Sequence, residues 1–353
     1  KTADILCKFF RSHGFDPQRI GNNVIVRNRD FSELRPTILL NSHHDTVKPV
    51  AGWLSAPFKA LDRGISITGL GSNDAGASLV SLAATFLYFD SYFRNPIRIL
   101  KSQNARFKSD KKRISTYKIP FNLLFVASAE EEVSGANGLE LVMKELQEPI
   151  YCAIVGEPTG MRMAVAEKGL LVLDCTVLGV AGHAAHATGE SALYKAIDDI
   201  QKLRNFEFEH KSNFLGDVKT TVTMIQAGTQ HNVIPAECTF TVDVRSNELY
   251  TNKEILHILE KELSPTTVKA RSLRLNSSKI EITHPLVQSA ERLGIELFGS
   301  PTISDQVFLP HIPSVKIGPG DTLRSHTANE FILESEIQHG IETYIRLLEN
   351  LQI

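Results

Sequence analysis

Three consecutive carboxylates stand at the end of an apolar stretch in the middle of the chain. Leu123 to Ala127 is a short apolar run, and Glu130, Glu131 and Glu132 follow it almost at once. Such a run, bounded by turn residues, is typical of a strand buried in a parallel sheet. Adjacent carboxylates repel one another unless a cation or a proton neutralises them, so the pattern indicates either a metal site or a solvated acidic turn.

A histidine and an aspartate follow a second strand-like run. Pro36 to Asn41 leads into His43 and Asp45, which point to the same side of an extended chain, whereas His44 points away. An imidazole with a carboxylate beside it is common at metal centres. A hydrogen-bonded polar pair without a metal is the alternative.

Asp74 and Glu157 extend this set of possible ligands. Gly64 to Gly71 predicts a strand and a glycine-rich turn, after which Asp74 precedes a helix predicted over Ala77 to Phe89, either as its cap or as a ligand. Tyr151 to Gly156 predicts another buried strand, which ends at Glu157. In open α/β sheets, ligands bind outside the carboxyl ends of the strands, so we expect these side chains at one sheet edge.

The pattern of predicted elements changes in the middle of the chain. Strands and helices alternate up to residue 166 and again from residue 279, with helices predicted over Leu286 to Phe298 and Glu330 to Leu351. Residues 167–278 predict the order strand, helix, strand, strand, helix, strand, which is typical of a ferredoxin-like α+β unit. We therefore predict an α/β domain over 1–166 and 279–353, with a mixed, mostly parallel sheet flanked by helices. The ferredoxin-like domain over 167–278 is inserted into it.

Composition excludes several classes of protein. The 353 residues contain 38 Lys and Arg against 40 Asp and Glu, a formal net charge of −2, which argues against nucleic acid as a partner. No apolar run approaches the roughly 18 residues that predict a membrane span. The four cysteines are far apart, which favours buried thiols in a cytoplasmic protein. Lys101 to Lys118 is strongly basic, and we interpret it as a solvated surface insertion, with steering of anionic substrates as the alternative.

The order of motifs resembles that of the M20 family of two-metal peptidases and deacylases. The resemblance is carried by HHDTVKP (43–49), GLGSNDAGA (69–77), SAEEEVSGANG (128–138), GEPT (156–159), GVAGHAAH (179–186), NVIPAE (232–237), GPGD (318–321) and HTANE (326–330). It implies a zinc-exopeptidase-like catalytic domain and use of the inserted domain for homodimerisation.

The resemblance also implies which residues hold metal. His43 and Glu157 would hold one ion, Glu132 and His326 would hold the other, and Asp74 would bridge the two. Two imidazoles and three carboxylates suit Zn²⁺, with Co²⁺ or Mn²⁺ as alternatives.

Further roles follow from the same resemblance. Glu131 would be the general base, Asp45 would orient His43, and His183 would stabilise the oxyanion, in several family members from the neighbouring subunit. Asn232 and Arg245 resemble positions near the substrate. Either Arg245 or Arg324 is a candidate to bind a substrate carboxylate, with an ordinary surface ion pair as the alternative.

These features predict an enzyme that hydrolyses the amide bond of an N-acyl amino acid. The amino-acid sequences of the motifs HHDTVKP and GLGSNDAGAS are most similar to those of the acetylornithine deacetylase branch. This resemblance implies N-acetyl- or N-succinyl-ornithine or -citrulline as the substrate, in arginine biosynthesis. The alternatives are a succinyl-diaminopimelate desuccinylase, a dipeptidase, and a metal-free homologue that only binds.

Overall fold

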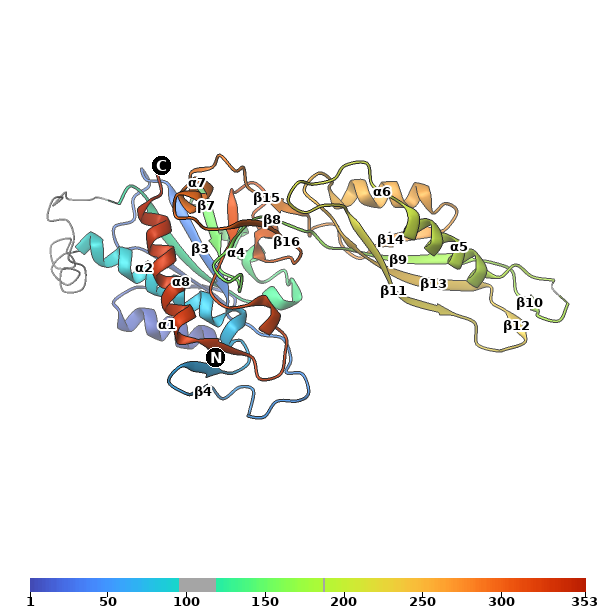
Figure 1. Ribbon diagram of the computed structural model, residues 1–353, viewed down its shortest axis with the longest axis horizontal. Coiled ribbons are helices and arrows are strands. Elements are labelled where there is room, and N and C mark those ends of the chain that lie inside the picture. The colour runs from blue at the N-terminus through green and yellow to red at the C-terminus, as the bar shows by residue number, and fades with distance from the viewer. Residues whose placement is uncertain (95–118, 187) are drawn as a thin grey trace. The chain divides into compact units, whose positions relative to one another are not determined.

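The computed structural model describes residues 1–94, 119–186 and 188–353, and it divides into two compact units (Figure 1). The first unit comprises Lys1–Val165, Ile280–Phe298 and Ser304–Ile353, and the second comprises Ala166–Lys279 and Gly299–Ile303. The basic segment Lys101 to Lys118 lies outside the described residues, so its interpretation stays a prediction.

The large sheet has nine strands, most of which belong to the first unit. Its strands are β1 (Gln18–Ile20), β2 (Asn23–Arg27), β3 (Thr37–His43), β6 (Asn122–Ser128), β7 (Ile150–Val155), β8 (Met163–Glu167), β15 (Ser278–Lys279), β16 (Leu297–Ser300) and β17 (Ser314–Lys316). Their order is β1-β2-β6-β3-β7-β17-β8-β15, and β16 also pairs with β8. Strands β6, β3, β7 and β17 are parallel, whereas β1, β2, β8 and β15 pair antiparallel. This mixed α/β sheet with a parallel centre confirms the predicted fold class.

Helices cover both faces of this sheet. The helices of the first unit are α1 (Thr2–Ser12), α2 (Ser78–Arg94), α4 (Leu139–Glu145), α7 (Pro285–Arg292) and α8 (Glu334–Glu349), with the short turns η1 (Ser72–Ala77), η2 (Glu131–Val133), η3 (Asp305–Phe308) and η4 (Thr322–Arg324). Alternate strand residues enter two cores: Ile38 and Leu40 pack with α1, α2, α7 and α8, and Leu39 packs with α4. Every residue of β3 and β6 is buried, which explains their continuous apolar sequences.

A four-stranded antiparallel sheet forms the second unit. Its elements are β9 (Leu171–Leu178), α5 (Ala192–Asn205), β11 (Lys219–Ala227), β13 (Glu237–Arg245), α6 (Asn252–Glu262) and β14 (Thr267–Ala270), and a separate ribbon joins β10 (Gly182–His183) to β12 (Val233–Ile234). The strand order β11-β13-β9-β14, with both helices packed on one face, is ferredoxin-like. Buried and half-exposed residues alternate along β9 and β13, as expected for a sheet with one covered face.

Two predicted helices are shorter in the structure, and one predicted strand lies outside the large sheet. The strand predicted over Gly64 to Gly71 is β5 (Ser66–Thr68), which pairs with β4 (Leu61–Asp62) and β18 (Phe331–Leu333) in a separate small sheet. The last helix therefore begins at Glu334, because the residues before it pair with β5. The helix predicted over Leu286 to Phe298 ends at Arg292, where Gly294 adopts a positive φ of 70° and the chain turns into β16.

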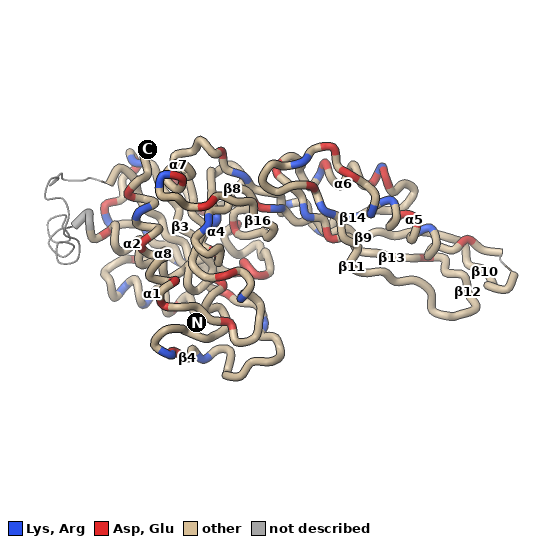
Figure 2. The backbone as a smooth tube through the Cα atoms, viewed as in Figure 1, with Lys and Arg blue, Asp and Glu red and all other residues tan. Residues whose placement is uncertain are grey.

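Acidic and basic residues are mixed along the described chain. Figure 2 shows positions of Lys and Arg interspersed with positions of Asp and Glu along the backbone of both units, and the net charge of the whole sequence is −2. Among the described residues, none of the helices has the combination of length and apolar character that crossing a membrane requires.

Candidate active site

The carboxyl ends of the parallel strands carry the acidic and histidine side chains singled out by the sequence. His43 is the last residue of β3, Glu131 and Glu132 begin η2 shortly after β6, and Glu157 follows β7 by two residues. Because these strands are parallel and adjacent, their ends meet at one edge of the sheet. Asp74 reaches the same place from η1, the turn before α2, rather than from the end of a central strand.

Two groups of potential metal ligands share Asp74. One group is His43, Asp74 and Glu157, the other is Asp74, Glu132 and His326, and the ligand atoms within each group lie within 4.8 Å of one another. Asp74 Oδ1 lies 3.1 Å from His43 Nε2, and its other oxygen, Oδ2, lies 3.7 Å from His326 Nε2. A carboxylate that turns one oxygen towards each histidine is arranged to bridge two ions.

The surroundings of Glu157 fit a cation. Its Oε1 atom is buried and finds no hydrogen-bond donor among the described residues, and it lies 3.8 Å from His43 Nε2. A buried acceptor without a donor is costly, so the position calls for a positive partner. The mixed set of imidazole nitrogens and carboxylate oxygens suits Zn²⁺ or a similar divalent ion.

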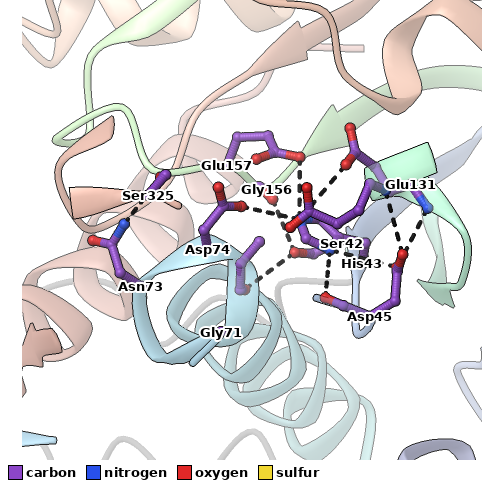
Figure 3. A network of polar contacts seen from close by, with 12 residues as sticks. Ser42, His43, Asp45, Gly71, Asn73, Asp74, Glu131, Gly156, Glu157 and Ser325 are labelled. Atoms are coloured by element: carbon purple, nitrogen blue, oxygen red, sulfur yellow. Dashed lines mark hydrogen bonds and ion pairs between the residues drawn. The ribbon is translucent and has the colours of Figure 1, made fainter. Parts of the chain in front are cut away.

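Asp45 contacts both His43 and the turn that carries Glu131 (Figure 3). His43 Nδ1 lies 3.1 Å from the backbone carbonyl oxygen of Asp45 and 3.6 Å from its carboxylate Oδ1, and the other ring nitrogen faces the ligand cluster. The same carboxylate accepts hydrogen bonds from the backbone N–H groups of Glu131 and Glu132, both at 3.3 Å. His44 points away, with its Nε2 atom 3.0 Å from the carbonyl oxygen of Asn22.

The crowded carboxylates shift several pKa values. Burial opposes the charged form of His43, but Asp45, Asp74 and Glu157 outweigh it and raise the pKa of His43 well above its usual value. Burial, followed by repulsion from Glu157, raises the pKa of Glu131 well above its usual value. Burial also raises the pKa of Glu157 to about 8. Without a cation these carboxyl groups therefore retain protons, which a metal ion would displace on binding.

Comparisons with known proteins find similar sequences and a matching domain family. The family model of the M20 peptidase dimerisation domain matches residues 165–271. An M20 peptidase domain-containing protein of Schizosaccharomyces pombe is 25% identical, and the match covers 98% of this chain and 79% of the relative. The chain is thus similar to M20 peptidases along nearly its whole length. The succinyl-diaminopimelate desuccinylase of Wolbachia pipientis wMel is 22% identical, over 99% of this chain and 88% of the relative.

The fold agrees with this assignment. A dinuclear metal-binding M20 peptidase of Bacillus subtilis superimposes with a TM-score of 0.68 at 16% identity, covering 98% of this chain and 90% of that one. The similarity to M20 peptidases and the two groups of potential metal ligands both indicate a metal-dependent hydrolase.

Three predicted M20 site residues belong to the second unit, and the structure brings two of them together. His183 pairs with Val233 in the β10–β12 ribbon, and the carbonyl oxygen of Asn232 accepts the N–H of Ala184 at 3.0 Å. Arg245 lies at the opposite end of β13, a strand of nine residues that spans roughly 27 Å at 3.4 Å per residue. The roles of these residues towards substrate stay predictions.

Arg324, in the first unit, already has two partners. Its Nη1 atom donates to Glu336 Oε2 at 2.7 Å, and its guanidinium lies 4.4 Å from the centre of the Phe331 ring. Arg245 is likewise paired, with Asp243 at 2.8 Å. Binding of a substrate carboxylate by Arg324 or Arg245 stays a prediction.

The structure adds a buried carboxylate that the sequence did not reveal. Asp305, the first residue of η3, accepts a hydrogen bond from Ser128 Oγ at 2.6 Å, directly behind the turn that carries the glutamates. Burial raises the pKa of Asp305 to about 6. The one signal in the sequence is an acid shortly before an apolar run, in ISDQVFLP (303–310). Glu330, which ends the motif HTANE, is the second such residue.

Proposed function

We propose that this protein hydrolyses the linear amide bond of an N-acyl amino acid with the help of two divalent metal ions, Zn²⁺ first among them. The observation that carries the proposal is the shared carboxylate: Asp74 belongs to both ligand groups, and Glu131 stands beside them. Glu131 Oε2 lies 4.0 Å from His43 Nε2 without belonging to either group, as a general base at such a centre should.

The proposed ligands are His43 and Glu157 for one ion, Glu132 and His326 for the other, and Asp74 for both. Divalent ions held in this way supply Lewis acidity and lower the pKa of a water molecule towards neutrality. They also compensate the negative charge that five clustered carboxylates and a substrate carboxylate would otherwise build up.

Glu131 carries the proton in the proposed reaction. Its carboxylate accepts a proton from the attacking water as the oxygen forms a bond to the amide carbon, and then donates that proton to the nitrogen as the C–N bond breaks. The backbone bonds from η2 to Asp45 hold Glu131 in place for both transfers. His183 would donate a hydrogen bond to the oxyanion, either within its own subunit or from a second one.

Within this class we place N-acetyl- and N-succinyl-ornithine and -citrulline first, which would give the enzyme a role in arginine biosynthesis. The amino-acid sequences of the motifs around His43 and Asp74 support this choice. The desuccinylase relative supports an N-acyl substrate in general, with succinyl-diaminopimelate as the alternative.

A peptide substrate is the second candidate, because the relative from Schizosaccharomyces pombe is named as a peptidase. A peptide and an N-acyl amino acid share an amide whose leaving amine carries a carboxylate. The two candidates therefore differ in the acyl side of the substrate and not in the chemistry.

We also propose that the enzyme is a homodimer formed through the second unit. The family match to a peptidase dimerisation domain supports this, and so does the edge strand β11, which exposes Met224 and Ile225. The four cysteines are free and buried, which supports a reducing compartment such as the cytoplasm.

Release of free amine tests the proposal. Acetylornithine, acetylcitrulline, succinylornithine, succinyl-diaminopimelate and a dipeptide are incubated with the protein, with Zn²⁺, with Co²⁺ or with a chelator, and Glu131→Gln serves as the inactive control. Metal-dependent cleavage of an N-acyl ornithine or citrulline supports the first substrate class. Cleavage of the dipeptide alone would replace it with the second, and no cleavage by a protein that binds two ions would refute both.

A further inference from the structure

The bend that carries Asp74 is held by a buried glutamate from the other end of the chain. Glu330, only 2% exposed, precedes β18, and its carboxylate accepts three backbone N–H hydrogen bonds. The donors are Gly71 to Oε2 at 2.9 Å, and Asn73 and Asp74 to Oε1 at 2.8 and 2.9 Å. The backbone carbonyl of Glu330 also accepts the N–H of Gly69 at 3.0 Å.

These three N–H groups have no helical partner of their own. They open η1, where the first amides of a helical turn point outward, and Asp74 departs from helical geometry with φ −114° and ψ 101°. A carboxylate that accepts several backbone N–H groups forms strong, charge-assisted hydrogen bonds. Glu330 therefore fixes the backbone on both sides of the shared ligand.

Asn73 joins this bend to the loop that carries His326. Its side-chain amide donates to Ser325 Oγ at 3.4 Å (Figure 3). The same amide donates to the carbonyl of Asp321 at 3.1 Å, and its Oδ1 accepts the N–H of Asp321 at 3.0 Å. The backbone at Gly320 lies so close to the Asn73 side chain that a Cβ on Gly320 would lie 2.3 Å from Asn73 Oδ1.

The loop needs such support because His326 itself has a left-handed backbone, with φ 60°. The backbone position of Asp74 thus depends on contacts made by its own N–H group and by its neighbours Gly71 and Asn73, in addition to the contacts of its side chain with the two histidines.

We propose that Glu330 is a positioning residue for the bridging carboxylate, and that Asn73 extends its effect to His326. This inference rests on the proposed function in that Asp74 is taken as the ligand shared by two ions. Because one carboxylate serves both groups, a shift of its backbone weakens both metal positions together. A residue with a merely structural role would lower the melting temperature without a selective loss of metal.

Metal titration of metal-free protein tests the proposal, with Zn²⁺ followed by calorimetry and Co²⁺ followed by its absorption spectrum. Glu330→Gln keeps an oxygen for Asn73 and Asp74 but turns an NH₂ group towards the N–H of Gly71, whereas Glu330→Ala removes all three acceptors. We expect affinity at both positions to fall by roughly 10- to 100-fold in Glu330→Gln, the usual range for partners behind a ligand, and further in Glu330→Ala. Asn73→Ala provides a third variant if Glu330→Ala does not fold.

Glu254→Gln is the matched control. Glu254 also accepts a backbone N–H, from Thr251 at 2.7 Å, in the capping box of α6, and that unit contributes no member of the two ligand groups. We expect this variant to lose stability and to keep wild-type metal affinity. Folded Glu330 variants that bind both ions as tightly as wild type, or lose only one of them, would overturn the inference.

Hydrogen exchange separates this inference from the proposed function. In metal-free protein, the amides of Gly71, Asn73 and Asp74 should exchange about tenfold or more faster in Glu330→Gln, since each loses or weakens a hydrogen bond. Unchanged exchange would refute the role of Glu330 directly. A wild-type protein that binds no pair of ions would instead refute the proposed function, whatever the exchange rates.

Discussion

His43 and His183 show how differently the two units hold their candidate residues. His43 is 1% exposed and ends a strand that is buried along its whole length, whereas His183 is exposed on a strand of two residues. Nδ1 of His43 lies 3.1 Å from the backbone carbonyl oxygen of Asp45 and Nε2 lies 3.1 Å from Asp74 Oδ1, while Nδ1 of His183 accepts the N–H of Ala185 at 3.1 Å. The ring of His43 is therefore held at both nitrogens in a buried position, whereas His183 is exposed to solvent.

The comparison separates two tasks of the proposed enzyme. Buried parallel strands, whose ends converge, suit a metal centre that must keep its geometry through every turnover. An exposed ribbon suits a residue that engages only when substrate is present. Changes in the first unit should therefore alter metal content or the chemical step, and changes in the ribbon should alter turnover alone.

The largest effect is expected from Glu131→Gln. The amide cannot accept the proton of the attacking water, so kcat should fall by about 10³-fold, within the range of general-base catalysis. Metal content, measured by atomic absorption, should remain at two ions per chain. Glu130→Gln is the control, because Glu130 bonds to Asn137 and belongs to neither ligand group. Turnover of Glu131→Gln within a few-fold of wild type would remove Glu131 as the base.

A smaller loss is expected from His183→Ala. Removal of one oxyanion donor should lower kcat by about 10²-fold, and metal content should not change because His183 belongs to neither ligand group. His186→Ala, whose ring lies 5.1 Å from that of His183, is the control and should retain most activity.

Mixing subunits decides whether His183 acts across a dimer. Heterodimers of His183→Ala and Glu131→Gln contain one site with both functional residues only if His183 reaches the partner's site. Recovered activity would therefore place it in the neighbouring subunit, and no recovery would place it in its own.

The metal-free protein should lose stability as pH rises. The pKa of Glu157 is raised to about 8, so between pH 4.5 and 8 the folded state retains a proton that the unfolded state releases, and the free energy of unfolding falls. His43, whose pKa is also raised, contributes stability that is likewise lost as pH rises through its folded pKa. The expected loss is a few kcal/mol, since each unit of pKa shift is worth about 1.4 kcal/mol.

Urea unfolding between pH 5 and 8 with a chelator measures this trend. Glu157→Gln should flatten it, and added Zn²⁺ should reverse it because metal binding requires the deprotonated ligands. A metal-free wild type that becomes more stable towards pH 8 would contradict the assignment of the buried carboxylates.

The residues that the sequence could reveal are those with a local signal. Continuous apolar runs predicted β3, β6 and β7, and the side chains that follow them are those that the structure brings together. Such a run fixes where a strand ends, and parallel pairing then fixes where the ends meet.

Non-local contacts carried no such signal. Ser128 and Asp305 are 177 positions apart, and Asp74 and Glu330 are 256 apart, so an isolated acid gives no hint of its partner. The pairing of β5 with β18 is equally distant, which explains why the sequence did not reveal β18 as a strand and why the last helix was predicted to begin too early. Asn232 and Arg245 were placed near the substrate only by resemblance, and that placement stays a prediction.

The smallest effect is expected from Arg324→Lys. The guanidinium already donates to Glu336 and stacks on Phe331, and both side chains of the ion pair are about one quarter exposed, at 23% and 26%. Lysine keeps the charge but loses the planar stacking, so the free energy of unfolding should fall by no more than about 1 kcal/mol. KM should change less than threefold, because a guanidinium held by the protein has little to offer a substrate carboxylate. A tenfold rise in KM with unchanged stability would show the reverse, and it would mean that Arg324 exchanges Glu336 for substrate and that the first unit recognises the carboxylate as well as cleaving the amide.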